Sequence, residues 1–179
     1  MSNARRIVVL ASAAALVAGA VALAPHHQSE KPARIRLGVY DSRGVAIAWA
    51  GSDFNTIGGK MKELEAAKAA GNQDEVKRLE EWGMMQQRLF HFQGFGRYPV
   101  DDYVAALADQ LPQLLKDRDL AAIVWLPAAA ADDVETVDVT VDLMKLFGMD
   151  ETKARKMMNE VSTHEPLEFA ELYNMDPRD

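Results

Sequence analysis

The apolar and polar positions of the chain set an N-terminal stretch apart from the rest. Residues 7–24 form an uninterrupted run of apolar and small residues, and Arg5 and Arg6 precede it without an acidic residue. A basic start followed by such a run is typical of an export signal, and its 18 residues also reach the lower limit for crossing a membrane. Residues 1–24 are therefore predicted to be a signal peptide, cleaved after Ala22, or else an N-terminal membrane anchor.

Polar and apolar residues follow different patterns in the remaining chain. Residues 25–34 contain two prolines and no apolar periodicity, which predicts a linker. Periodic patterns begin at Ile35 and end near Val161, and this range is expected to be one folded domain. Residues 162–179 are acidic and are expected to form a tail that is at most partly helical.

The first half of the domain predicts a strand and then a pair of helices. Residues 35–40 alternate with a period of two, as in a strand with one buried face, and Asp41-Ser42 offers an N-cap for a short helix. Strong helix formers fill two longer segments, which the pair Gly71-Asn72 separates. Because helices joined by so short a turn run antiparallel, residues 60–93 are predicted to be an antiparallel helical hairpin.

The second half predicts further helices and two short strands. A helix over 100–118 contains Pro112, where it must bend or restart, because proline cannot donate a backbone hydrogen bond. The other expected elements are strands at 121–126 and 135–139, a helix that Thr140 caps and that ends near Phe147, and a helix from Asp150 or Thr152 to Val161. The fold class that follows is α+β, a small β-sheet body with a protruding antiparallel α-helical hairpin.

Charge and composition exclude several classes of function. The chain of 179 residues has a formal net charge of −7, which argues against nucleic acid as a partner, because phosphate-binding surfaces need an excess of Lys and Arg. The absence of cysteine excludes a disulfide framework, a zinc–thiolate site, an iron–sulfur cluster and a cysteine nucleophile.

Residue types that could carry chemistry occur without the spacing that chemistry requires. The densest acidic stretch consists of Asp132, Asp133, Glu135, Asp138 and Asp142, and it lacks the central Gly and terminal Glu of a calcium loop. His26-His27, His91 and His164 have no second ligand at zinc-like spacing, and neither Ser42 nor Ser52 lies in a nucleophile motif. We therefore expect no catalytic residue, no metal and no cofactor, and a protein that is not an enzyme.

Segments at both ends of the domain resemble a known family. The segment 35–42 (IRLGVYDS) is similar to the first strand and turn of the Skp/OmpH family of periplasmic chaperones. The segments 122–125 (AIVW) and 138–143 (DVTVDL) look like that family's second strand and the entry to its closing helix. Residues 35–161 thus resemble a divergent member of the family with a short helical hairpin. The predicted export signal agrees with this resemblance.

The resemblance implies a function as well as a fold. Members form homotrimers whose strands share a central body and whose helical hairpins enclose unfolded outer-membrane polypeptides, so the implied role is that of a holdase without catalysis. The implied location is the periplasm or cell envelope, with a link to the inner membrane only through residues 7–24 if they are not cleaved. The alternative is a membrane-anchored envelope protein whose hairpin docks one specific partner.

Flexible and aromatic side chains on and beside the hairpin are the candidates for partner binding. They are Trp82, Met84, Met85, Phe90, Phe92, Phe95 and Tyr98. Such groups suit a promiscuous apolar surface. Two ordinary explanations remain open, because those at helical spacing could pack against the facing helix, and Phe95 and Tyr98 could cover the joint between hairpin and body.

Overall fold

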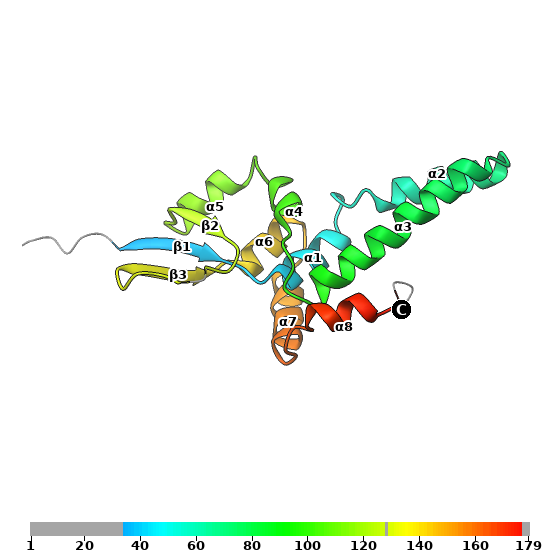
Figure 1. The fold of residues 1–179 in the computed structure, drawn as a ribbon. Helices are drawn as coiled ribbons and strands as arrows, with labels where there is room; N and C mark the ends of the chain where they lie inside the picture. The colour runs from blue at the N-terminus through cyan, green and yellow to red at the C-terminus, as the bar shows by residue number, and fades with distance from the viewer. Residues whose placement is uncertain (1–33, 128, 177–179) are drawn as a thin grey trace, which may run out of the picture. The chain divides into compact units, whose positions relative to one another are not determined.

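A small sheet of three parallel strands organises the part of the chain that the computed structural model describes, residues 34–127 and 129–176 (Figure 1). Strand β1 (Ile35–Val39) lies in the centre, between β2 (Ala122–Val124) and β3 (Val134–Asp138). Val39 pairs with Val124 on one side and with Asp138 on the other. The direction of the strands, which the sequence pattern left open, is parallel throughout. The predicted export signal and most of the predicted linker lie outside the described residues.

The core covers the face of the sheet that carries Gly38 and Tyr40 of β1. The alternation of residues in β1 predicted the opposite face, with Ile35, Leu37 and Val39, to be the buried one. Tyr40, Val137 and Val139 belong to the core on this face, and a Cβ placed on Gly38 would meet Leu120 and Ile123 at 3.0 Å. The face with Ile35, Leu37 and Val39 is only partly buried, and Ile35 is 51% exposed. The absent side chain of Gly38 explains the reversal, because it lets its neighbours pack directly onto the backbone.

Short helices complete the core beyond the carboxyl ends of the strands. Helix α1 (Ser42–Ala50) follows β1 and packs against α6 (Thr140–Leu146) and α7 (Glu151–Ser162). Asp41 is the N-cap of α1, as predicted, because its carboxylate accepts a hydrogen bond from the Arg43 backbone N–H. Asp150 caps α7 in the same way through the Lys153 N–H.

The predicted cap at Thr140 is wrong. Val139 is the N-cap of α6 and makes no side-chain cap, while the Thr140 hydroxyl donates to Asp138 and accepts from the Asp41 backbone N–H at 2.9 Å. The hydroxyl is thus used to join the ends of two parallel strands, since Asp138 ends β3 and Asp41 follows β1. This tertiary role is invisible in the local sequence.

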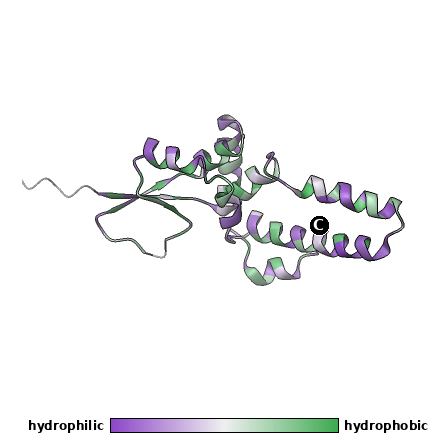
Figure 2. Ribbon diagram, turned by 90° about the horizontal axis from the view of Figure 1, so that it is seen from above, coloured by the Kyte–Doolittle hydropathy of each residue, from purple (hydrophilic) through white to green (hydrophobic). Residues whose placement is uncertain are grey.

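The predicted hairpin is confirmed. Helix α2 (Ile57–Ala69) and helix α3 (Gln73–Gly94) run side by side in opposite directions and extend away from the sheet (Figure 2). Gly71 has φ +68°, the left-handed conformation that suits glycine, and Asn72 caps α3. Near the tip, Leu64 and Ala67 of α2 pack against Val76 and Leu79 of α3 in a small core of their own.

The helix expected over 100–118 is two helices. Helix α4 (Asp101–Ala105) ends well before α5 (Leu111–Asp117), and Pro112 lies in the first turn of α5. The chain therefore restarts at the proline, where the missing N–H would have no partner within the helix anyway.

The C-terminal segment contains a docked helix, α8 (Phe169–Asn174), which lies beside α3 (Figure 2). Leu172 is only 3% exposed and fills the space that Gly96 leaves, because a Cβ on Gly96 would lie 2.6 Å from the Leu172 side chain. The backbone N–H of Leu167 also donates to the Phe95 carbonyl. None of the helices in the described residues has the length and apolar character needed to cross a membrane.

Candidate functional site

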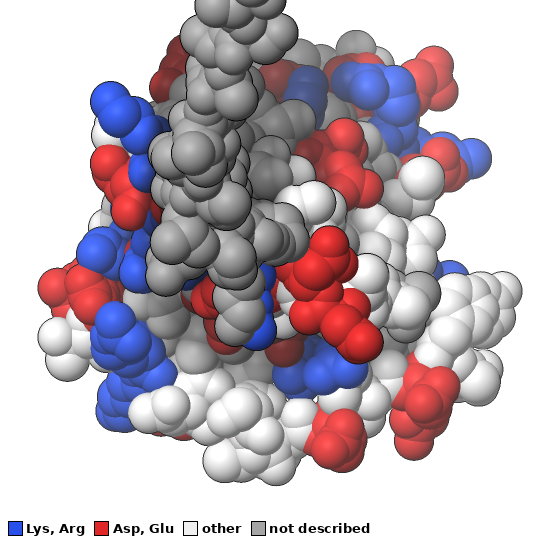
Figure 3. Space-filling model, turned by 90° about the vertical axis from the view of Figure 1, so that its left-hand side faces the viewer, with Lys and Arg blue, Asp and Glu red and all other residues white. Residues whose placement is uncertain are grey.

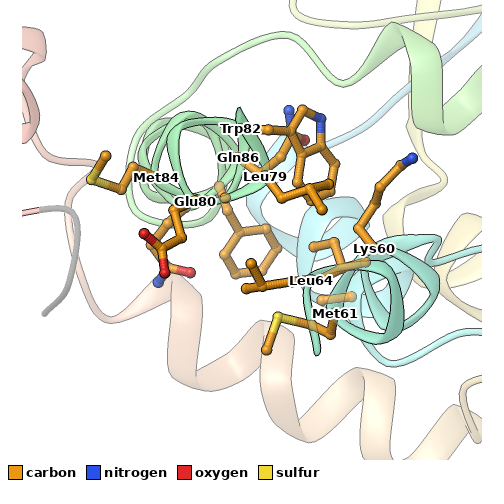
Figure 4. Close-up of a pocket in the computed structure, with 13 residues that line it drawn as sticks. Lys60, Met61, Leu64, Leu79, Glu80, Trp82, Met84 and Gln86 are labelled. Atoms are coloured by element: carbon orange, nitrogen blue, oxygen red, sulfur yellow. The ribbon is translucent and has the colours of Figure 1, made fainter. Parts of the chain in front are cut away.

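An open apolar groove of about 630 Å³ lies between α2 and α3. Met61 and Leu64 of α2 and Leu79 and Trp82 of α3 point into the space between the two helices (Figure 4). Phe90 closes the groove toward the body, where it packs against the main core. The lining is mostly apolar, so the groove is suited to apolar side chains.

The groove exists because the two helices do not fill the space between them. Their contact near the tip is complete, but Gly83 of α3 also lines the groove and carries no side chain. A Cβ placed on Gly83 would meet nothing within 4 Å. Glycine weakens a helix interior by roughly 1 kcal/mol relative to alanine, so its presence here costs stability and leaves the groove open.

Charged groups lie only at the rim. Lys60 pairs with Glu63 at 2.7 Å within α2, and Lys68 pairs with Glu80 of α3 at 3.5 Å across the hairpin. Figure 4 places Lys60 at the edge of the groove. Besides Lys60 and Glu80, the polar residues of the lining are Gln86 and Gln87, so the site can bind apolar side chains with a few hydrogen bonds to an adjacent backbone.

The structure divides the seven predicted binding residues into separate sets. Trp82 and Phe90 line the groove, whereas Met84 lies at its edge and points away from α2 (Figure 4). Met85 is 69% exposed and lines a different hollow, together with Met84.

The remaining predicted residues lie near the end of α3. The Phe92 ring contacts Tyr98 on one side and Phe169 of α8 on the other. Phe95 is 50% exposed, lies beside His91, and lines a hollow together with Ile47 of α1 and Val161 of α7. Sequence reasoning missed Phe169, which belongs to the expected tail, and Met61, whose spacing of three from Leu64 was the available signal.

The titratable groups with shifted pKa values lie away from the groove. Burial raises the pKa of the Tyr40 hydroxyl to about 12, and the charge of Asp101 adds to this. Burial also acts to raise the pKa of Asp41, but hydrogen bonds from Arg43 and the charges of Arg43 and Arg97 outweigh it and lower the value. Tyr40 is part of the main core and Asp41 caps α1, and both line a small hollow of about 190 Å³ at the carboxyl end of β1.

Three carboxylates of the acidic stretch and the side chain of His91 have local partners. Asp142 accepts three hydrogen bonds from Arg118, Glu135 lies 3.4 Å from Arg36, and Asp138 accepts a hydrogen bond from the Thr140 hydroxyl. His91 is buried and lies 3.1 Å from the Gln87 amide. In the described part of the chain, no three His, Asp or Glu side chains gather where they could hold a metal ion.

Comparison of the chain with known protein families, with curated proteins and with solved structures finds no match.

Proposed function

We propose that the protein is a chaperone-like holdase of the periplasm or cell envelope, which binds unfolded or outer-membrane polypeptides without catalysis. The observation that carries the proposal is the open apolar groove on a hairpin that extends from the body. Its volume of about 630 Å³ is in the usual range for binding pockets and receives a few side chains of an extended segment. The resemblance of residues 35–161 to the Skp/OmpH family supports the same role.

The chemistry of the groove suits many different segments. Met61 is unbranched and 53% exposed, so it can adopt different rotamers against different side chains. Trp82 adds a large apolar surface that one aromatic residue of a client can cover. A site of this kind selects for apolar character more than for one sequence, which is the selectivity that a holdase needs.

The surface charge is compatible with a polypeptide partner. On the face in Figure 3, acidic and basic side chains are interspersed, without a continuous basic area. The chain as a whole has a formal net charge of −7, which keeps it soluble while it binds apolar segments and gives nucleic acid little attraction.

The partly buried face of the sheet supports the proposal that the protein is a homotrimer. Parallel sheets are normally covered on both sides, yet Ile35, Leu37 and Val39 lie outside the core of the described residues. Val124 and Val134, which belong to the same face by their register, also lie outside it. Contact with further copies would bury this face and group the hairpins on one side of a shared body.

Filling the groove tests the binding proposal without weakening the fold. Gly83→Met places a side chain in the groove and replaces glycine in a helix interior, so we expect equal or higher thermal stability. We expect the affinity for a fluorescent, urea-unfolded outer-membrane protein to fall about tenfold, because Met occupies the client's space.

The control for this variant is Gly59→Met. Gly59 also lies in a helix with no atom within 4 Å of its Cβ position, but it does not line the groove. Binding should remain unchanged in this control. Equal affinity in both variants would contradict the assignment of the groove.

A charge on the open sheet face tests the trimer. Leu37→Lys is expected to reduce the mass measured by light scattering from about three times the chain mass of 19.8 kDa to that of one chain. The reason is that an interface would bury the ammonium group without a partner, which costs several kcal/mol. Met61→Lys, on the hairpin, should leave the mass unchanged, and a monomeric wild-type protein would refute the trimer.

A further inference from the structure

Exposed apolar side chains concentrate in the second half of α3 and the residues after it, and in α8 and the residues before it. Among the described residues, ten large apolar side chains are exposed, and seven of them belong to the segments 84–98 and 167–173. Phe169 and Tyr173 are 63% and 56% exposed. Scattered exposed apolar groups are ordinary on a protein surface, but a concentration of this kind marks an interaction site.

The rings on this side form a continuous row. Tyr98, Phe92, Phe169 and Tyr173 follow one another with centroid separations of 5.7, 5.2 and 6.0 Å. The last two steps are nearly parallel, with interplanar angles of 24° and 22°. The guanidinium of Arg88 lies 5.6 Å from the centre of the Tyr173 ring and extends the row along α3. We call these four rings the aromatic row.

Two hollows flank the aromatic row. One, of about 390 Å³, is formed by Met84, Met85, Glu81 and Arg88 of α3. The other, of about 510 Å³, lies beside Phe92, Tyr98 and Phe169. Aromatic residues, Met and Arg are the residue types enriched in the centres of protein–protein interfaces, and the hollows are places where anchoring side chains could insert.

Carboxylates dominate the border of this surface. The acidic residues of the border are all exposed, and they are Glu81, Glu165, Glu168 and Glu171. The basic residues of the border are Arg88 and Arg97. The Arg88 charge already lies over an aromatic ring. The border is therefore net acidic and complements a partner with Lys or Arg beside its apolar residues.

We propose that the aromatic row is a second interaction surface, which docks a basic amphipathic helix of a partner protein. The ring separations of 5.2–6.0 Å match the roughly 5–6 Å between side chains one turn apart on a helix. A polyproline segment repeats only every ~9 Å, which fits the rings less well. This surface goes beyond the proposed function, because it lies on the far side of α3 from the groove residues Leu79 and Phe90 and shares only Met84 with the groove.

The test titrates the full chain with a synthetic helical peptide of about four turns. The peptide has Leu and Phe on one face and Lys on both flanks, and fluorescence anisotropy measures binding. We expect Phe169→Ser with Tyr173→Ser to weaken binding about tenfold. Met85→Ser, a change on α3 that leaves α8 intact, should weaken it several-fold. Met61→Ser and Gly83→Met, both in the groove, should weaken it less than either surface variant, because the carboxylates that attract the Lys flanks lie beside the aromatic row.

Other outcomes would overturn the proposal. Equal affinity of wild type and both surface variants, or equal binding of a peptide with Glu in place of Lys, would exclude this surface as a basic-helix site. A separate experiment measures binding to vesicles of three parts phosphatidylcholine to one part phosphatidylglycerol. If the surface variants lose vesicle binding but keep peptide binding, the row contacts lipid instead. If they change only the oligomeric mass, its partner is a second copy of the chain.

Discussion

Replacing Arg43 with Met is expected to lower the free energy of unfolding by about 3–5 kcal/mol, since it leaves a partly buried carboxylate without its partner. The Arg43 side chain is almost fully buried, and its Nη2 lies 2.7 Å from Asp41 Oδ2. Its Nη1 donates to the carbonyls of His164 and Val161, at 2.8 and 3.3 Å. The guanidinium thus joins the start of α1 to the end of α7, and Met replaces none of these bonds.

Urea denaturation followed by circular dichroism at pH 7 measures this loss. Arg155→Met is the control, because Arg155 is exposed and pairs only with Glu151 on the same helix. Its unfolding curve should match that of the wild type. An Arg43→Met protein as stable as this control would show that the buried pair does not hold α1 to α7.

The contribution of this pair also predicts a pH dependence. Although burial acts to raise the pKa of Asp41, its bonds with Arg43 lower it below the ordinary value. Because the folded-state pKa is lowered, the ionised Asp41 carboxylate contributes to stability above about pH 4. This contribution is lost as the pH falls through the folded-state pKa. The stability difference between wild type and Arg43→Met should therefore be largest near neutrality and shrink below pH 4.

Replacing Gly44 with Val is expected to destabilise the protein by about 2–3 kcal/mol through overpacking. A Cβ at Gly44 would lie 2.7 Å from Thr140 Cγ2 and inside contact distance of Met158, so α1 would have to move away from both α6 and α7. Met158 can change rotamer, but Thr140 is held by hydrogen bonds to Asp138 and Asp41.

Thermal unfolding measures the effect, with Gly59→Val as the control. Gly59 has open space around its Cβ position, so the same substitution there should change the melting temperature little. If Gly44→Val were as stable as Gly59→Val, the close approach of α1 to α6 and α7 would not be needed for the fold.

Local patterns predicted those elements whose cause lies within the segment itself. The turn at Gly71-Asn72 defines the hairpin because glycine adopts the positive φ that ends α2, and Pro112 starts a new helix because it lacks an N–H. The strands β1 and β3 were predicted within one residue at each end.

Features that depend on distant contacts were not predictable from the sequence. The covered face of β1 is determined by side chains that pack onto Gly38, and the Thr140 hydroxyl bonds to residues of two different strands. Helix α8 depends on the space above Gly96 for Leu172. For the same reason the candidate binding residues were found as one set but lie in separate places, since only the fold separates Trp82 in the groove from Phe92 in the aromatic row.

Aggregation of a client shows whether the protein acts as a holdase. A denatured outer-membrane protein is diluted into buffer with the chain from Ala33 onward, which contains the whole core of the described residues, and light scattering is followed. We expect suppression at stoichiometric amounts by the wild type and by Gly59→Met, but much weaker suppression by Gly83→Met. Scattering as high as with an inert acidic protein, from a chain shown by circular dichroism to be folded, would contradict the proposed holdase function.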